Sequence, residues 1–225
     1  MRLQIAIDGP AASGKTTVAR CLADRLNLLY LDTGAMYRAL AYVALNTRTD
    51  LDNQSALVRL IDQHAIGVEL DRAAPLGFRI RADGEELTPE ALQSNAVTSV
   101  VSTIAAQPVV REAMVREQRR IAQAGPVVMA GRDIGTVVLP DAPHKIFLTA
   151  SVQARVQRRR RQMETMGVDV NAHELAAEIE ERDRLDESRA ASPLRPARDA
   201  VVIDSSAMSA AAVVDRICAI VDPAA

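Results

Sequence analysis

The residues that most directly indicate chemistry lie near the N-terminus, where Gly9-Pro-Ala-Ala-Ser-Gly-Lys-Thr16 fits the pattern G-x-x-x-x-G-K-[ST]. In this pattern, successive backbone N–H groups wrap a phosphate, and the following helix adds the positive end of its dipole. Lys15, one of only two lysines in the chain, can reach the terminal phosphates of a triphosphate, and the Thr16 hydroxyl can ligate Mg²⁺. The sequence therefore predicts an ATP-type phosphate loop formed by Gly9, Pro10, Ala11, Ala12, Ser13, Gly14, Lys15, Thr16 and Thr17.

A carboxylate close to this loop would complete a magnesium site, and two strand-like segments end in aspartate. Leu28-Leu-Tyr-Leu-Asp32 belongs to the same strand–helix–strand unit as the loop, whereas Val201-Val-Ile-Asp204 follows much later. An aspartate at a strand end is often a cap or loop residue, and this interpretation is favoured for Asp204. We predict that Asp32 and Thr16 hold the metal.

A run of arginines forms the second candidate group. Arg155, Arg158 and Arg159 share one face of a predicted helix, at spacings of three and four residues. One interpretation is a solvated surface neutralised by nearby acids. The other is a mobile lid whose arginines close on a phosphoryl group in transfer. The acids that would neutralise a solvated surface are Glu178, Glu180, Glu181, Asp183, Asp186 and Glu187. A nucleic-acid surface is disfavoured, because no aromatic residues interleave with the arginines and the net charge is -2.

A third group of charged residues follows predicted strands or helix starts. Arg38 follows Asp32-Thr33-Gly34, Arg111 follows Pro108, and Arg132-Asp133 follows an apolar strand. Ligands of open α/β sheets bind at the carboxyl ends of the strands. Arg132 and Asp133 are therefore placed for a ligand, although a local ion pair that stabilises the turn is the alternative.

The elements that must position these residues follow an alternating pattern. Strands and helices alternate towards both ends of the chain, which is typical of a parallel sheet flanked by helices, an α/β fold. Residues 66–87, with the Asp83-Gly84 turn, are predicted to form a small antiparallel insert. The main strands are predicted at 3–7, 28–31, 127–130, 144–148 and 200–204, and the helices at 15–26, 35–45, 54–64, 89–105, 109–123, 151–166, 172–188 and 209–221.

The composition is that of an average globular protein, with 48% hydrophobic and 25% charged residues. No apolar run approaches the ~20 residues of a membrane span, and the first residues lack an apolar signal segment. Cys21 and Cys218 lie in apolar helical patterns and are predicted to be small buried residues. We therefore expect a cytoplasmic protein that binds neither membrane nor nucleic acid. No coiled-coil repeat is visible, and we expect a monomer.

Four segments together resemble the bacterial cytidylate kinase family. They are Ile7-Asp-Gly-Pro-Ala-Ala-Ser-Gly-Lys-Thr-Thr17, Leu31-Asp-Thr-Gly-Ala-Met-Tyr-Arg38, Gly131-Arg-Asp-Ile-Gly-Thr-Val-Val138, and Glu181-Arg-Asp183 with Arg189-Ala-Ala-Ser-Pro-Leu194. The resemblance implies a P-loop nucleoside monophosphate kinase core with a small antiparallel insert and a helical lid. It also implies Mg²⁺-dependent transfer of a phosphoryl group from ATP to CMP or dCMP.

The resemblance further implies a division of the single kinase domain 1–225 and a role for each matching residue. The core would comprise about 1–34, 125–150 and 195–225, the acceptor-binding region about 35–124, and the lid about 151–190. The acceptor phosphate would be held by Thr33, Arg38, Arg132 and Arg189; the cytosine by Ser102, Arg111 and Asp133; and the ribose by Arg182 and Asp186. Arg155, Arg158 and Arg159 would lie near the ATP phosphates, and catalysis would depend on Lys15, Arg132, Arg155 and Arg159.

Two other classes of function remain open from the residues themselves. A phosphate-loop kinase with a hydroxyl acceptor, such as a sugar, would need a general base, and His64, His144 and His173 lie outside the motifs. A non-catalytic ATP-dependent regulator or nucleic-acid binder is disfavoured by the pI near 6.0 and by the absence of a recognition module.

Overall fold

A sheet of five parallel strands forms the centre of the molecule, as a computed structural model shows for residues 3–165, 167, 170–189 and 191–221. Its strand order is β2-β6-β1-β7-β8. The central strand β1 pairs in parallel with β6 and β7, and its residues 5–8 are buried. This arrangement confirms the predicted α/β class. The strands are β1 (Gln4–Asp8), β2 (Leu29–Asp32), β6 (Val127–Gly131), β7 (His144–Thr149) and β8 (Val201–Asp204).

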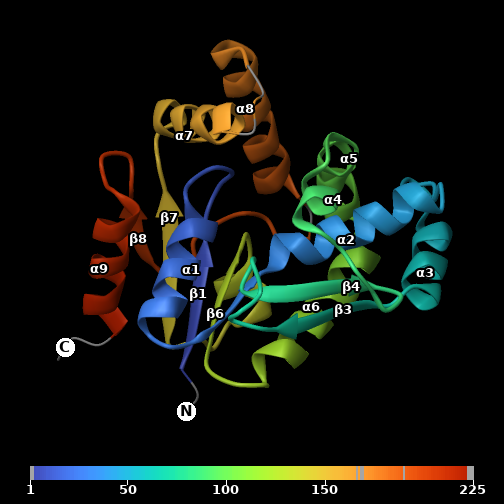
Figure 1. Cartoon of the computed structure of the whole chain (residues 1–225), viewed down its shortest axis with the longest axis horizontal. Coiled ribbons are helices and arrows are strands. Elements are labelled where there is room, and N and C mark those ends of the chain that lie inside the picture. The colour runs from blue at the N-terminus through green and yellow to red at the C-terminus, as the bar shows by residue number, and fades with distance from the viewer. Residues whose placement is uncertain (1–2, 166, 168–169, 190, 222–225) are drawn as a thin grey trace.

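Helices pack against both faces of this sheet. Helix α1 (Lys15–Arg25) leaves the phosphate loop and packs against β6 and α9 (Ala210–Val221), the last helix of the chain. Helix α2 (Thr33–Asn46) starts directly after β2, and the Asp32 carboxylate caps it by accepting from the Gly34 N–H. Figure 1 shows α1 and α9 side by side, with α2 extending away from the sheet.

The insert is a separate antiparallel sheet, as predicted. It consists of β3 (Ile66–Leu70), β4 (Phe78–Ala82) and the short β5 (Glu85–Glu86), and α3 (Gln54–Gln63) precedes it. Phe78 of β4 packs against Tyr30 of β2, with ring centroids 6.0 Å apart. The insert is therefore attached to the edge of the main sheet by an aromatic contact.

The segment predicted as one helix over 89–105 is two helices, α4 (Pro89–Gln93) and α5 (Asn95–Ala106). Ser94 interrupts them because its ψ of 151° is extended, and its hydroxyl accepts from the Val97 N–H to cap the second helix. The apolar periodicity continues across the break, which explains why the sequence prediction was wrong at this point. Helix α6 (Pro108–Ala122) follows as predicted.

Two charged helices, α7 (Val152–Thr165) and α8 (Ala172–Ser188), follow β7. Figure 1 shows them above the carboxyl ends of the strands, with α4 and α5 across from them. These helices lie within the segment predicted as a lid, and part of the predicted break between them at 167–169 falls outside the described residues. These helices therefore lie at the end of the sheet where ligands of such folds bind.

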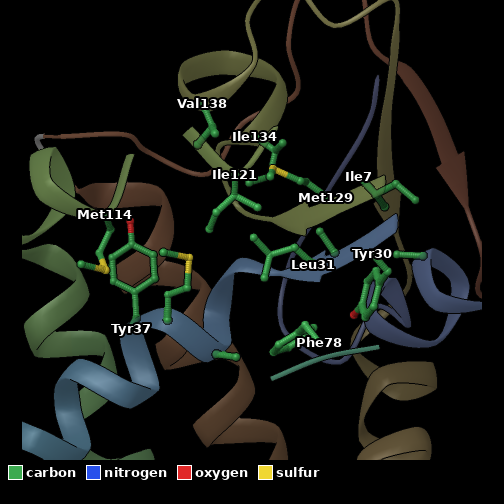
Figure 2. Close-up of a cluster of buried hydrophobic side chains, with 14 of the residues drawn as sticks. Ile7, Tyr30, Leu31, Tyr37, Phe78, Met114, Ile121, Met129, Ile134 and Val138 are labelled. Carbon is green, nitrogen blue, oxygen red and sulfur yellow. The ribbon is translucent and has the colours of Figure 1, made fainter. Parts of the chain in front are cut away.

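The core is aliphatic, as the composition requires. Figure 2 shows Leu31 of β2 and Met129 of β6 at its centre, with Ile134 and Ile121 close by.

Cys21 is exposed, which corrects the prediction that both cysteines are buried; Cys218 is partly buried. Val18 and Leu22 occupy the buried side of α1, and Cys21 lies on its other side. No helix among the described residues is long and apolar enough to cross a membrane.

Candidate active site

A cleft of about 840 Å³ opens at the carboxyl ends of the strands. It brings together the phosphate loop, the ends of β2 and β6, and residues of α5, α6, α7 and α8. Most of the residues singled out in the sequence line it: Ala11, Ala12, Ser13, Gly14, Lys15, Thr16, Thr17, Asp32, Thr33, Arg38, Ser102, Arg111, Arg132, Asp133, Arg158, Arg159, Arg182, Asp186 and Arg189. Gly9, Pro10 and Arg155 are not among its lining residues.

The phosphate loop requires glycine where it leaves the sheet. Gly9 has φ 152°, and a Cβ at this position would lie 2.0 Å from the carbonyl oxygen of Leu148. At the other end of the loop, Gly14 has φ 95° and caps α1 without a side chain. The loop therefore presents its backbone N–H groups and the start of α1 to the same space.

Lys15 lies in the bend of the loop and is 7% exposed. Its Nζ donates to the Pro10 carbonyl at 2.6 Å and to the Ser13 hydroxyl at 3.3 Å. Burial, together with the nearby positive charge of Arg132, lowers the pKa of Lys15 well below its usual value. A bound anion would reverse this effect, because it supplies the negative charge that this site lacks.

Thr16 and Asp32 come together as the sequence predicted. The Thr16 hydroxyl donates to Asp32 Oδ2 at 2.8 Å, while Asp32 Oδ1 caps α2. Among the described residues, no group of three or more His, Cys, Asp or Glu side chains could hold a metal. A hydroxyl and one carboxylate suit Mg²⁺, because this ion usually retains several waters and takes its other ligands from phosphates. The two residues therefore fit the predicted metal.

Arg111 and Asp133 form a buried ion pair at another part of the cleft. Arg111 Nη2 donates to Asp133 Oδ2, and the two side chains are 4% and 6% exposed. Arg111 also donates to the Ala105 carbonyl at 3.1 Å and lies over the ring of Tyr37, 5.4 Å from its centroid. These contacts fix the orientation of Asp133, so the carboxylate can act as a rigid acceptor.

Three arginines surround Asp186 of α8. Arg132 Nε donates to Asp186 Oδ2 at 2.7 Å, and Arg189 Nη2 donates to Asp186 Oδ1. Although burial acts to raise it, Arg132 and Arg189 together hold the pKa of Asp186 below its usual value. Burial and Arg132 lower the pKa of Arg182 to about 10. Positive charge thus exceeds negative charge here, as expected of a site for a phosphate.

The other predicted acceptor residues also line the cleft. Thr33 donates to the Ala130 carbonyl at 3.0 Å, which joins the end of β2 to β6. Arg38 of α2 donates to the Leu92 carbonyl at 3.0 Å and to the Thr98 hydroxyl at 2.9 Å, and burial lowers its pKa. Ser102 lines the cleft from α5.

The model of the cytidylate kinase family matches residues 5–223. The chain belongs to the cytidylate kinase family. It is 51% identical to the cytidylate kinase of Pelotomaculum thermopropionicum over 96% of this chain and 94% of that protein. It is also 51% identical to a bifunctional pantoate ligase/cytidylate kinase of Synechococcus sp. (strain JA-3-3Ab), covering 95% of this chain.

The chain spans 39% of the length of this bifunctional protein and of a second one, from Synechococcus sp. (strain JA-2-3B'a(2-13)). A solved structure of an uncharacterized protein from Eubacterium ventriosum is similar in fold, with a TM-score of 0.55, 15% identity and coverage of 98% and 99% of the two chains. The family predicted from the sequence is confirmed.

The predicted lid arginines of this cytidylate kinase family member divide into two sets. Arg158 and Arg159 line the cleft; Arg158 also donates to the Ser13 carbonyl at 3.1 Å. Arg155 is not among the residues that line the cleft, although it contacts the phosphate loop. Its side chain is buried against the phosphate loop and donates to the carbonyls of Ala11 and Ala150. The three arginines share one face of α7. The part of this face with Arg155 is buried against the phosphate loop, and the part with Arg158 and Arg159 lines the cleft.

Asp8, which the sequence analysis did not single out, is central to this kinase fold. Its carboxylate accepts from the N–H groups of Ile134 and Gly135, each at 2.7 Å. It thereby holds a short π-helix (η1, Ile134–Val138) directly after Arg132-Asp133. Burial raises the pKa of Asp8 to about 6. An aspartate as the last residue of an apolar strand, just before the phosphate loop, was the available signal.

Proposed function

We propose that the chain transfers the γ-phosphoryl group of ATP to CMP or dCMP, producing ADP and CDP or dCDP. The observation that supports this most is the composition of a single cleft. It is lined by the phosphate loop, by the buried Arg111–Asp133 pair and by the arginines around Asp186. A donor site, an acceptor-base site and a positive region for the acceptor phosphate therefore share one space.

The donor triphosphate would bind to the N–H groups of the phosphate loop, with Lys15 at its terminal phosphates. Thr16 and Asp32 would hold Mg²⁺, which when bound neutralises charge on the triphosphate. Arg158 and Arg159 reach the same cleft from α7. Positive groups that are already in place stabilise the charge of the transferring group without reorganising.

Asp133 provides the selectivity for cytosine. Arg111 occupies its Oδ2, which leaves Oδ1 to accept a hydrogen bond from the exocyclic amino group of cytosine. Uracil has a carbonyl oxygen at this position, and the two acceptors would face each other. Leaving a buried acceptor unpaired costs about 1–3 kcal/mol. Ser102 and Arg111 would contact the rest of the pyrimidine edge, and Asp186 and Arg182 the ribose.

The transfer itself needs no general base, because the attacking group is the phosphate of the acceptor, already anionic at neutral pH. We propose direct in-line transfer without a covalent enzyme intermediate. Positioning and charge neutralisation by Lys15, Arg132 and the lid arginines would supply the catalysis. A hydroxyl acceptor would require a base, and no histidine is found among the described residues that line the cleft.

We propose the same division of the chain as the sequence suggested. The five strands of the main sheet fall within 1–34, 125–150 and 195–225. The insert and helices α3 to α6 fall within 35–124, which α2 enters from Thr33, and α7 and α8 fall within 151–190. Closure of this lid over both nucleotides would exclude water and so prevent hydrolysis of ATP. We propose a cytoplasmic monomer.

The decisive experiment measures ADP release with ATP, Mg²⁺ and each of CMP, dCMP, UMP, AMP and GMP. We expect turnover to be strong with CMP and dCMP and weak with the other three monophosphates. ADP release that is independent of any monophosphate would instead indicate a hydrolase, and would contradict the proposal.

A further inference from the structure

Asp183 of α8 contacts the phosphate loop, although no role in the reaction has been assigned to it above. Its Oδ1 accepts from the backbone N–H of Ala11 at 3.2 Å, and its Oδ2 accepts from Nη1 of Arg155. The same Nη1 donates to the carbonyl oxygen of Ala11 at 3.2 Å. Asp183 and Arg155 therefore hold both backbone polar groups of Ala11, which lies 172 residues away from Asp183 in the chain.

The charge of Asp183 matters because Arg155 is buried. The two side chains are 13% and 7% exposed, and the other acceptors of Arg155 are neutral carbonyls. Among the described residues, Asp183 is the carboxylate that pairs with Arg155. Without Asp183, the buried guanidinium of Arg155 would lose its counter-ion, and the Ala11 N–H would lose its acceptor. This part of the loop would then no longer be fixed.

The next acid on the same face of α8 makes contacts of a different kind. Asp186 binds Arg132 and Arg189, which we assign to the acceptor phosphate. Two aspartates three residues apart thus attach one helix to the donor loop and to the acceptor arginines. Removing Asp183 alone should therefore affect the donor side and leave the acceptor side intact.

We propose that Asp183 is a positioning residue for ATP, which holds the phosphate loop in its nucleotide-binding conformation through Ala11 and Arg155. This inference rests on the proposed function. When only a fraction of the molecules has the binding-competent loop, the apparent dissociation constant rises by the inverse of that fraction. A fall of the competent fraction to about one tenth weakens ATP binding about tenfold.

The test compares Asp183→Asn with Glu181→Gln by calorimetric titration with a non-hydrolysable ATP analogue plus Mg²⁺ and, separately, with CMP. Glu181 is the matched control, because it lies on the same helix but forms an exposed pair with Arg184. For Asp183→Asn we expect about tenfold weaker binding of the analogue and CMP binding within about twofold of the unmodified chain. Glu181→Gln should leave both affinities within about twofold. Unchanged binding of the analogue, or equal weakening of both ligands, would overturn the proposal.

A double-mutant cycle compares Asp183→Asn, Arg155→Met and the double variant, so that the conclusion does not depend on one variant alone. Because Asp183 acts partly through Arg155, the loss of affinity in the double variant should be smaller than the sum of the two single losses, and additive losses would contradict this. Steady-state rates should show a raised KM for ATP and an unchanged KM for CMP. If the unmodified chain fails to phosphorylate CMP, the proposed function fails, yet the analogue titrations still decide the role of Asp183.

Discussion

The two lysines of the chain allow a matched test of the phosphate loop, because both are buried but only one lines the cleft. Lys15 and Lys145 are 7% and 9% exposed. Lys15 bonds to Pro10 and Ser13 inside the loop, whereas Lys145 donates to the Pro140 carbonyl and pairs with the exposed Asp199. Replacing each by methionine keeps the length of the side chain and removes the cation.

Lys145→Met should mainly lower the stability of the protein, whereas Lys15→Met should mainly lower its turnover. Lys145→Met loses a buried charge-assisted hydrogen bond, worth about 1.5–3 kcal/mol. For a chain of this size, this corresponds to a fall in Tm of about 3–12 °C, with turnover retained. Lys15→Met also loses hydrogen bonds, but it removes a cation whose pKa is lowered by burial and by the nearby charge of Arg132. Its Tm should therefore stay within about 3 °C, while kcat falls at least 10²–10³-fold, as for other preorganised catalytic donors.

Thermal unfolding and initial rates on both variants check this reasoning. ATP at about 100 times its dissociation constant stabilises a folded protein by about 2.7 kcal/mol. That shift in Tm should be present in Lys145→Met and largely absent in Lys15→Met. The reasoning would be refuted if Lys15→Met kept turnover within tenfold of the unmodified chain, or if it lost as much stability as Lys145→Met.

Three further variants address the acceptor side and the fold. Asp133→Ala should reduce the ratio of kcat/KM for CMP to that for UMP about 5- to 150-fold, equivalent to 1–3 kcal/mol, and an unchanged ratio rejects the base-reading role. Asp186→Asn leaves Arg132 and Arg189 without a counter-ion and should lower the free energy of unfolding by about 3–5 kcal/mol in urea titrations; equal midpoints would contradict this. Asp8 has a pKa of about 6 in the folded state against 3.8 for the free side chain, so its contribution to stability is present below pH 3.8 and is lost as pH rises through 6. The stability difference between the unmodified chain and Asp8→Asn should therefore change by on the order of 3 kcal/mol across that window, and a constant difference would be inconsistent with the buried carboxyl.

Much of the donor site could be predicted from the sequence because its chemistry is local. The phosphate loop, its helix and Asp32 lie within a short stretch, and the spacing of the loop alone predicts which of its residues line the cleft. The break at Ser94 could not be predicted in the same way, because the apolar periodicity continues through it. Asp8 was overlooked since its partners, Ile134 and Gly135, are more than 120 residues away.

The position of each acid around α8 indicates whether it is buried or exposed. One interpretation of the sequence was that these acids neutralise a solvated surface, and Glu181 does form an exposed pair with Arg184. Leu175 and Ile179, however, define a buried stripe on this helix, and continuing it by three or four residues leads to 182, 183 and 186. The stripe changes from apolar to charged where the helix reaches the cleft. A charged residue in phase with a buried apolar stripe should have its counter-ion inside the protein, and Asp183 and Asp186 each have one.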